Sequence, residues 1–200
     1  MNTFRTATVS AVVTALGAAS LAFATAAPVQ AAPKPAFLAA KELPASLTAW
    51  TADPVAQGKA DDFCYAKALP KKGSSHREFR TELDTSAVQT VTVAASATEA
   101  KKLVTKVRAA VEGCLEELRA EDPGLTGKEK YHGRIAVEEG AHVYSLDTAT
   151  AHGATDIHLY SVGRDGRTVT VVHWGQLGDL ADAPLKGFQK TARTSVAKLY

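Results

Sequence analysis

The chain has 200 residues, of which 46% are hydrophobic and 22% are charged, and its formal net charge is +2. A nearly neutral chain lacks the basic face that binding to nucleic acid or to an anionic membrane requires, so we expect neither as a partner. The length suffices for one domain with a sizeable hydrophobic core.

The first 31 residues have the three parts of a secretory signal peptide. Arg5 gives a charged start, an apolar run follows over residues 11–27, and the small residues Val29 and Ala31 resemble an A-x-A cleavage site. Cleavage after Ala31 leaves 169 residues with a formal charge of +1. Because no cysteine lies near the cut to carry a lipid, we expect a secreted, extracellular protein without a membrane anchor.

Proline and alanine dominate the region that follows the signal peptide. Residues 32–44 are expected to form a flexible N-terminal segment, and residues 45–200 a single domain. In the domain, Trp50 is the best candidate for a side chain that anchors this region on the core. A short helical turn around Cys64 should end at Pro70.

The chain contains two cysteines, Cys64 and Cys114, and both lie beyond the signal peptide. An exported protein meets an oxidising environment, and two thiols allow only one intramolecular pairing. We therefore predict a disulfide between Cys64 and Cys114.

The pattern of apolar residues predicts strands first and then a helix. Residues 78–83 and 86–96 read as extended segments, and Ser96 with Glu99 forms a capping box at the start of a helix. Apolar residues then recur at helical spacing from Ala100 to Leu118, so that Cys114 faces the core. The helix should end at 122–124.

The last third of the chain predicts more strands and a closing helix. Two short strands are expected around 138–140, and residues 157–174 read as a hairpin with a turn at Asp165 and Gly166. Asp182 and Pro184 mark the start of a C-terminal helix. Strands followed by one-sided amphipathic helices indicate an α+β fold, an antiparallel sheet with helices packed on one face.

The hairpin carries two histidines, His158 and His173, whose relation depends on the turn. A two-residue turn at 165–166 places them directly opposite each other on one face, with Tyr160 and Val171 beside them. A three-residue loop over 164–166 shifts the register by one residue and turns the histidines to opposite faces. The sequence fits both loops.

The residue patterns do not predict catalytic residues, a metal site or a cofactor. Two histidines are half of a zinc site, and no H-x-x-x-H or H-E-x-x-H spacing occurs. No G-x-S-x-G motif is present either. The residues that we expect near a ligand cleft are His158, Tyr160, His173 and Trp174, although core packing is the alternative role for Trp174.

The order of these elements resembles the PknH-like extracellular sensor domains. The resemblance rests on FC at Cys64, the helix that ends with VEGCLEELR at Cys114, the strand pair that leads to VVHWGQ, and the closing helix, over roughly residues 45–200. It implies an α+β domain with a cleft that binds a ligand and has no catalytic residues. The family typically has two disulfides, whereas this chain can form only one.

We therefore expect a secreted, sensor-like module that binds a small or envelope-derived ligand, or another exported protein, beside the C-terminal hairpin. A small secreted hydrolase is the first alternative, and it requires His158 or His173 within hydrogen-bond reach of a Ser, Asp or Glu. A protein inhibitor is the second alternative, and it requires a rigid protruding loop, for which residues 70–76 and 122–133 are the candidates.

Overall fold

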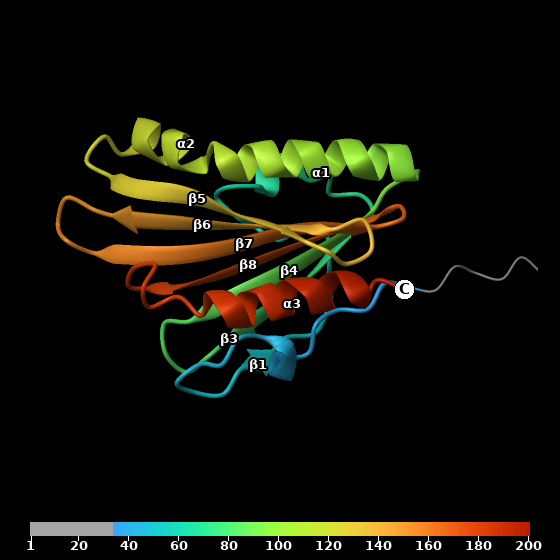
Figure 1. Ribbon diagram of the computed structural model, residues 1–200, viewed down its shortest axis with the longest axis horizontal. Coiled ribbons are helices and arrows are strands. Elements are labelled where there is room, and N and C mark those ends of the chain that lie inside the picture. The colour runs from blue at the N-terminus through green and yellow to red at the C-terminus, as the bar shows by residue number, and fades with distance from the viewer. Residues whose placement is uncertain (1–33) are drawn as a thin grey trace, which may run out of the picture. The chain divides into compact units, whose positions relative to one another are not determined.

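The computed structural model describes residues 34–200, so the expected signal peptide lies outside the described residues. These residues form one antiparallel sheet of eight strands with the order β1-β3-β4-β8-β7-β6-β5, in which β2 also pairs with β3 (Figure 1). The α+β class and the antiparallel sheet are confirmed. Within residues 34–200, no helix combines the length and the apolar character needed to cross a membrane.

The described residues form eight strands, three α-helices and two short 3-10 turns. The strands are β1 (Thr51–Ala52), β2 (Ala56–Gln57), β3 (Ser74–Arg80), β4 (Ser86–Val93), β5 (Thr126–Ile135), β6 (Ala141–Ala149), β7 (Thr155–Asp165) and β8 (Thr168–Leu177). The α-helices are α1 (Ala97–Glu112), α2 (Cys114–Glu121) and α3 (Leu185–Ala197), and two 3-10 turns are η1 (Ala40–Glu42) and η2 (Ala66–Ala68).

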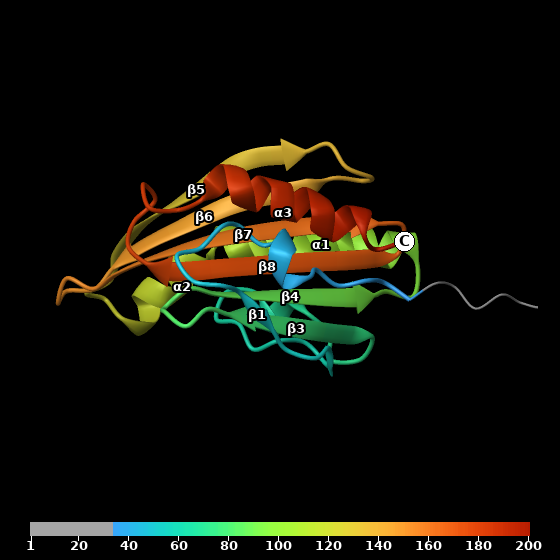
Figure 2. The same ribbon diagram turned by 90° about the horizontal axis from the view of Figure 1, so that it is seen from below.

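The helices cover both faces of the sheet, whereas the sequence led us to expect them on one. Helices α1 and α2 pack on one face, with Tyr160 and Val171 beneath them, and α3 packs on the other face against Leu159 and Trp174 (Figures 1 and 2). The physical reason is that β7 and β8 are apolar on both sides, since Leu159, Tyr160, Val171 and Val172 are all fully buried. Alternate residues of a strand point to opposite faces, so such strands need a cover on each.

The long helix predicted before residue 122 is divided in two. Ser96 accepts a hydrogen bond from the Glu99 backbone N–H, which confirms the predicted N-cap. The helix then breaks at Gly113, and α2 begins at Cys114. The side chain that the sequence placed on the core, Cys114, is 1% exposed.

Residues 34–44, the described part of the segment expected to be flexible, pack against the domain. Leu38 is fully buried beneath α3, its N–H donates to Oε1 of Gln89, and its carbonyl accepts from Arg77. The N–H of Ala36 donates to the carbonyl of Lys198. This segment therefore completes the core on the α3 face.

The hairpin turn lies one residue later than predicted. Asp165 pairs with Thr168, so Gly166 and Arg167 form a two-residue connection, and the register differs from both alternatives considered from the sequence. Gly166 has φ +52°, a left-handed conformation that glycine adopts at little cost and that suits the first position of a tight hairpin turn. Tyr160 therefore faces His173, and Gly175 faces His158.

A disulfide joins Cys64 to Cys114, as predicted, with the two Cα atoms 5.1 Å apart. It links the loop before η2 to the first residue of α2. Both cysteines are buried in the core under α1 and α2. The chain before η2 is thereby fixed above the β7 and β8 strands.

Replacing both cysteines with alanine should lower the melting temperature. In the chain-entropy model a loop of this length contributes up to about 4 kcal/mol, which corresponds to a fall of roughly 10 °C for a domain of this size. Thermal unfolding followed by circular dichroism measures the change. An unchanged melting curve would show that the disulfide does not stabilise the fold.

Candidate functional site

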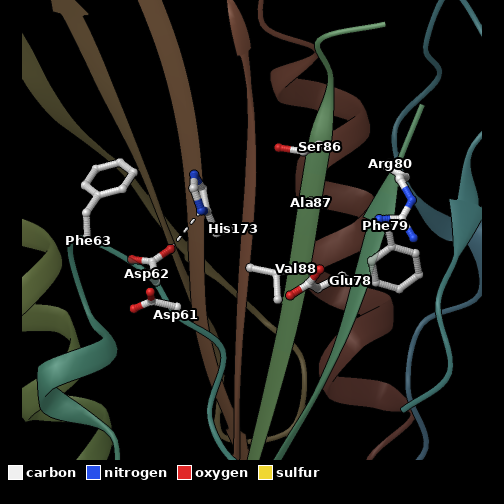
Figure 3. Close-up of a pocket in the computed structure, with 10 residues that line it drawn as sticks. All are labelled: Asp61, Asp62, Phe63, Glu78, Phe79, Arg80, Ser86, Ala87, Val88 and His173. Carbon is white, nitrogen blue, oxygen red and sulfur yellow. Dashed lines mark ion pairs between the residues drawn. The ribbon is translucent and has the colours of Figure 1, made fainter. Parts of the chain in front are cut away.

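An open pocket of about 540 Å³ lies on the sheet face that α1 and α2 cover only in part. Helix α1 packs mainly on β6, β7 and β8. The floor of the pocket is formed by β3, β4 and β8, and one wall is the loop over residues 61–63 (Figure 3). The pocket therefore exists because the helices do not reach the β3 edge of this face.

Asp62 organises the loop that forms this wall. Its Oδ1 accepts hydrogen bonds from the backbone N–H groups of Cys64 (2.9 Å) and Tyr65 (3.1 Å), an arrangement that fixes the turn leading into η2. Its side chain is 1% exposed. The neighbouring disulfide at Cys64 holds the same turn from the other side.

The second oxygen of Asp62 lies beside the histidine pair. Oδ2 is 2.8 Å from Nδ1 of His173, an ion-pair distance, but the approach does not have hydrogen-bond geometry. Nε2 of His173 is in turn 3.0 Å from Nδ1 of His158. The Asp62 carboxylate and the two imidazoles thus form a continuous series of contacting side chains from the loop to the sheet.

The charge of the Asp62 carboxylate determines which tautomers of His173 and His158 are favoured. Negative charge beside Nδ1 of His173 favours a hydrogen on that atom, and in this tautomer Nε2 is an acceptor. His158 must then donate through Nδ1, and its own Nε2 is the acceptor. Burial, and secondarily the adjacent His173, lowers the pKa of His158 to about 3, so this ring is neutral at physiological pH.

Close packing holds both rings in place. Tyr160 stacks on His173 with ring centroids 4.4 Å apart, and Phe63 packs edge-on against both histidines. Gly175 lies opposite His158, and a Cβ at this position would lie 2.7 Å from Nδ1 of His158. The ring of His158 can therefore lean toward His173 only because residue 175 has no side chain.

The structure brings together three of the four residues expected at a cleft. His158, Tyr160 and His173 share one face, but only His173 lines the pocket, and Tyr160 is fully buried below it. Trp174 lies on the opposite face beneath α3 and is 1% exposed, so its role is the alternative one, core packing. The cleft lies beside β3 and β4, away from the hairpin turn.

Sequence reasoning missed most residues that line the pocket, and they come from three separate segments of the chain. The polar ones among them are Asp61, Asp62, Glu78, Arg80 and Ser86. The only local signal was the Asp-Asp-Phe-Cys run, which places two carboxylates and an aromatic ring immediately before a disulfide cysteine. Cross-strand pairing of Glu78 with Val88, and of Val88 with His173, was not visible before the register was known.

The two loops proposed for an inhibitor are shorter than expected, because strands take up part of each. Residues 74–76 belong to β3, and residues 126–133 belong to β5. The parts of these candidates that lie outside the strands are residues 70–73 and 122–125.

Comparisons of the chain with protein families, with curated proteins and with solved structures found no match. Within the described residues, no group of three or more His, Cys, Asp or Glu side chains is arranged to hold a metal ion. The chemistry of the pocket is therefore inferred from its own geometry.

The buried neutral histidine makes folding sensitive to acid. The pKa of His158 is about 3 in the folded protein and near 6.5 when unfolded, so its contribution to stability is complete above pH 6.5 and is lost as the pH falls toward 3. The free energy of unfolding should fall with a slope approaching about 1.4 kcal/mol per pH unit from this group. Urea unfolding of wild type and His158→Gln between pH 7 and 4 measures it, and an equal slope in the variant would contradict the assignment.

Proposed function

We propose that this protein is a secreted, sensor-like module that binds a small ligand in the pocket beside Asp62 and His173. The observation that carries the proposal is that the two histidines of the pocket wall are already joined to each other. Nε2 of His173, the atom that a catalytic histidine directs at a nucleophile or substrate, is bonded to His158 instead. Such a wall has a fixed shape and does not present an activated base.

The anchoring of the wall supports the same function. The disulfide and the two hydrogen bonds to Asp62 hold residues 61–64 before any ligand arrives. A preformed pocket binds more tightly than one that must be ordered, because no loop entropy is lost on association. The order of elements that resembles PknH-like sensor domains agrees with a binding role.

A fragment screen on the purified protein tests the proposal. A library of water-soluble cationic, anionic and neutral fragments should shift the amide NMR signals of Phe63, Val88 and His173. Val88→Tyr should abolish these shifts, because the larger side chain fills the pocket, while Thr126→Tyr on the exposed part of β5 should leave them unchanged. Fragments that bind only elsewhere, or nowhere, would overturn the proposal.

A secreted hydrolase is the second candidate, and one observation favours it. Ser86, His173 and Asp62 line the same pocket, and the contact between Asp62 and His173 resembles the orienting pair of a serine hydrolase. Among the described residues, however, no hydrogen bond joins Ser86 to either histidine of the pair. The missing contact is the one that activates the nucleophile.

A fluorophosphonate probe separates the two candidates. A binding module should not react with the probe, because Ser86 has no base beside it. Labelling of wild type that Ser86→Ala removes would favour the hydrolase and reject the noncatalytic function. Intact-mass spectrometry gives the readout directly.

A further inference from the structure

The charged groups around the pocket are unequal in sign. Three carboxylates line it, Asp61 and Asp62 from the loop and Glu78 from β3, and Figure 3 shows the aspartates on the wall and Glu78 on the strands opposite. Among the described lining residues, Arg80 is the one lysine or arginine. The guanidinium of Arg80 is 2.6 Å from both carboxylate oxygens of Asp53, so its charge is already balanced outside the pocket.

One of these carboxylates is buried with incomplete hydrogen bonding, which leaves its negative charge only partly compensated. Oδ2 of Asp62 is buried and accepts no hydrogen bond from the described residues, although its side chain is 1% exposed. The neighbouring His173 contacts it without hydrogen-bond geometry. A buried carboxylate oxygen ordinarily has a hydrogen-bond donor, because leaving it without one costs free energy.

Phe63 adds an aromatic surface at the same wall. Its ring is edge-on to both histidines, and the residue is 44% exposed although it is a large hydrophobic one. An aromatic face attracts an organic cation through its quadrupole. Carboxylates on two sides and an exposed phenyl ring are the groups with which proteins bind ammonium ligands.

We infer that the ligand of this pocket carries an organic ammonium group that lies between the 61–63 loop and Glu78. This inference rests on the proposed binding function and adds the chemical class of the ligand. The ammonium group would balance the negative charge that Asp61, Asp62 and Glu78 place around the pocket. Its alkyl part would lie on Phe63 and Val88.

Three probes of equal chain length test the class of the ligand. Pentylamine is a cation at pH 7, pentan-1-ol is neutral and pentanoate is an anion. Titrations followed by the amide NMR signals of Phe63, Glu78, Val88 and His173 should show binding of pentylamine that is weakened by salt, and weaker binding of the other two. The double variant Asp61→Asn, Glu78→Gln should weaken pentylamine binding about fivefold to tenfold, as expected for two exposed charge contacts.

The control variant Glu116→Gln, Glu121→Gln removes the same charge from the exposed surface of α2 and should leave pentylamine binding unchanged. Equal weakening in this control would assign the effect to overall charge and overturn the inference. Equal or tighter binding of pentan-1-ol or pentanoate in the pocket would overturn the ammonium class but leave the binding function standing. If no probe shifts the pocket signals, the ammonium class is rejected, and the fragment screen separately decides whether the pocket binds ligands at all.

Discussion

The Asp62 carboxylate is the group on which the rest of the site depends. One of its oxygens fixes the turn before η2 through two backbone N–H groups, and the other sets the charge beside His173. The tautomer of His173 then determines which nitrogen of His158 donates. A single buried side chain thereby connects the backbone of the loop to two strands, and its cost of desolvation is offset only while these contacts persist.

The disulfide couples this arrangement to helix α2. Cys64 follows Asp62 by two residues and is covalently joined to the start of α2, so the loop cannot leave the sheet without breaking a bond or moving the helix. The face between this loop and the β3 edge stays open, because α1 packs on β6, β7 and β8. Rigidity on one side and an uncovered sheet on the other together produce the pocket.

Features that depend on neighbouring residues were predictable from the sequence. Features that depend on which strands pair, and in which register, were not. The Ser96 cap, the Cys64–Cys114 disulfide and the hairpin itself follow from composition and short-range spacing. The turn moved by one residue because Gly166 suits more than one turn position, and each choice changes every cross-strand partner. Asp62 meets His173 across more than a hundred residues of sequence, a contact that no local pattern indicates.

The neutrality of His158 bears on the choice between binding and catalysis. A general base is most effective when its pKa lies near the working pH, whereas burial lowers the pKa of His158 to about 3. This ring gains too little from taking a proton to drive a reaction near neutrality. The same low basicity keeps it uncharged beside a cation, so a ligand ammonium would meet the carboxylates of the pocket without repulsion from His158. The histidine pair therefore suits the wall of a binding pocket better than a proton relay.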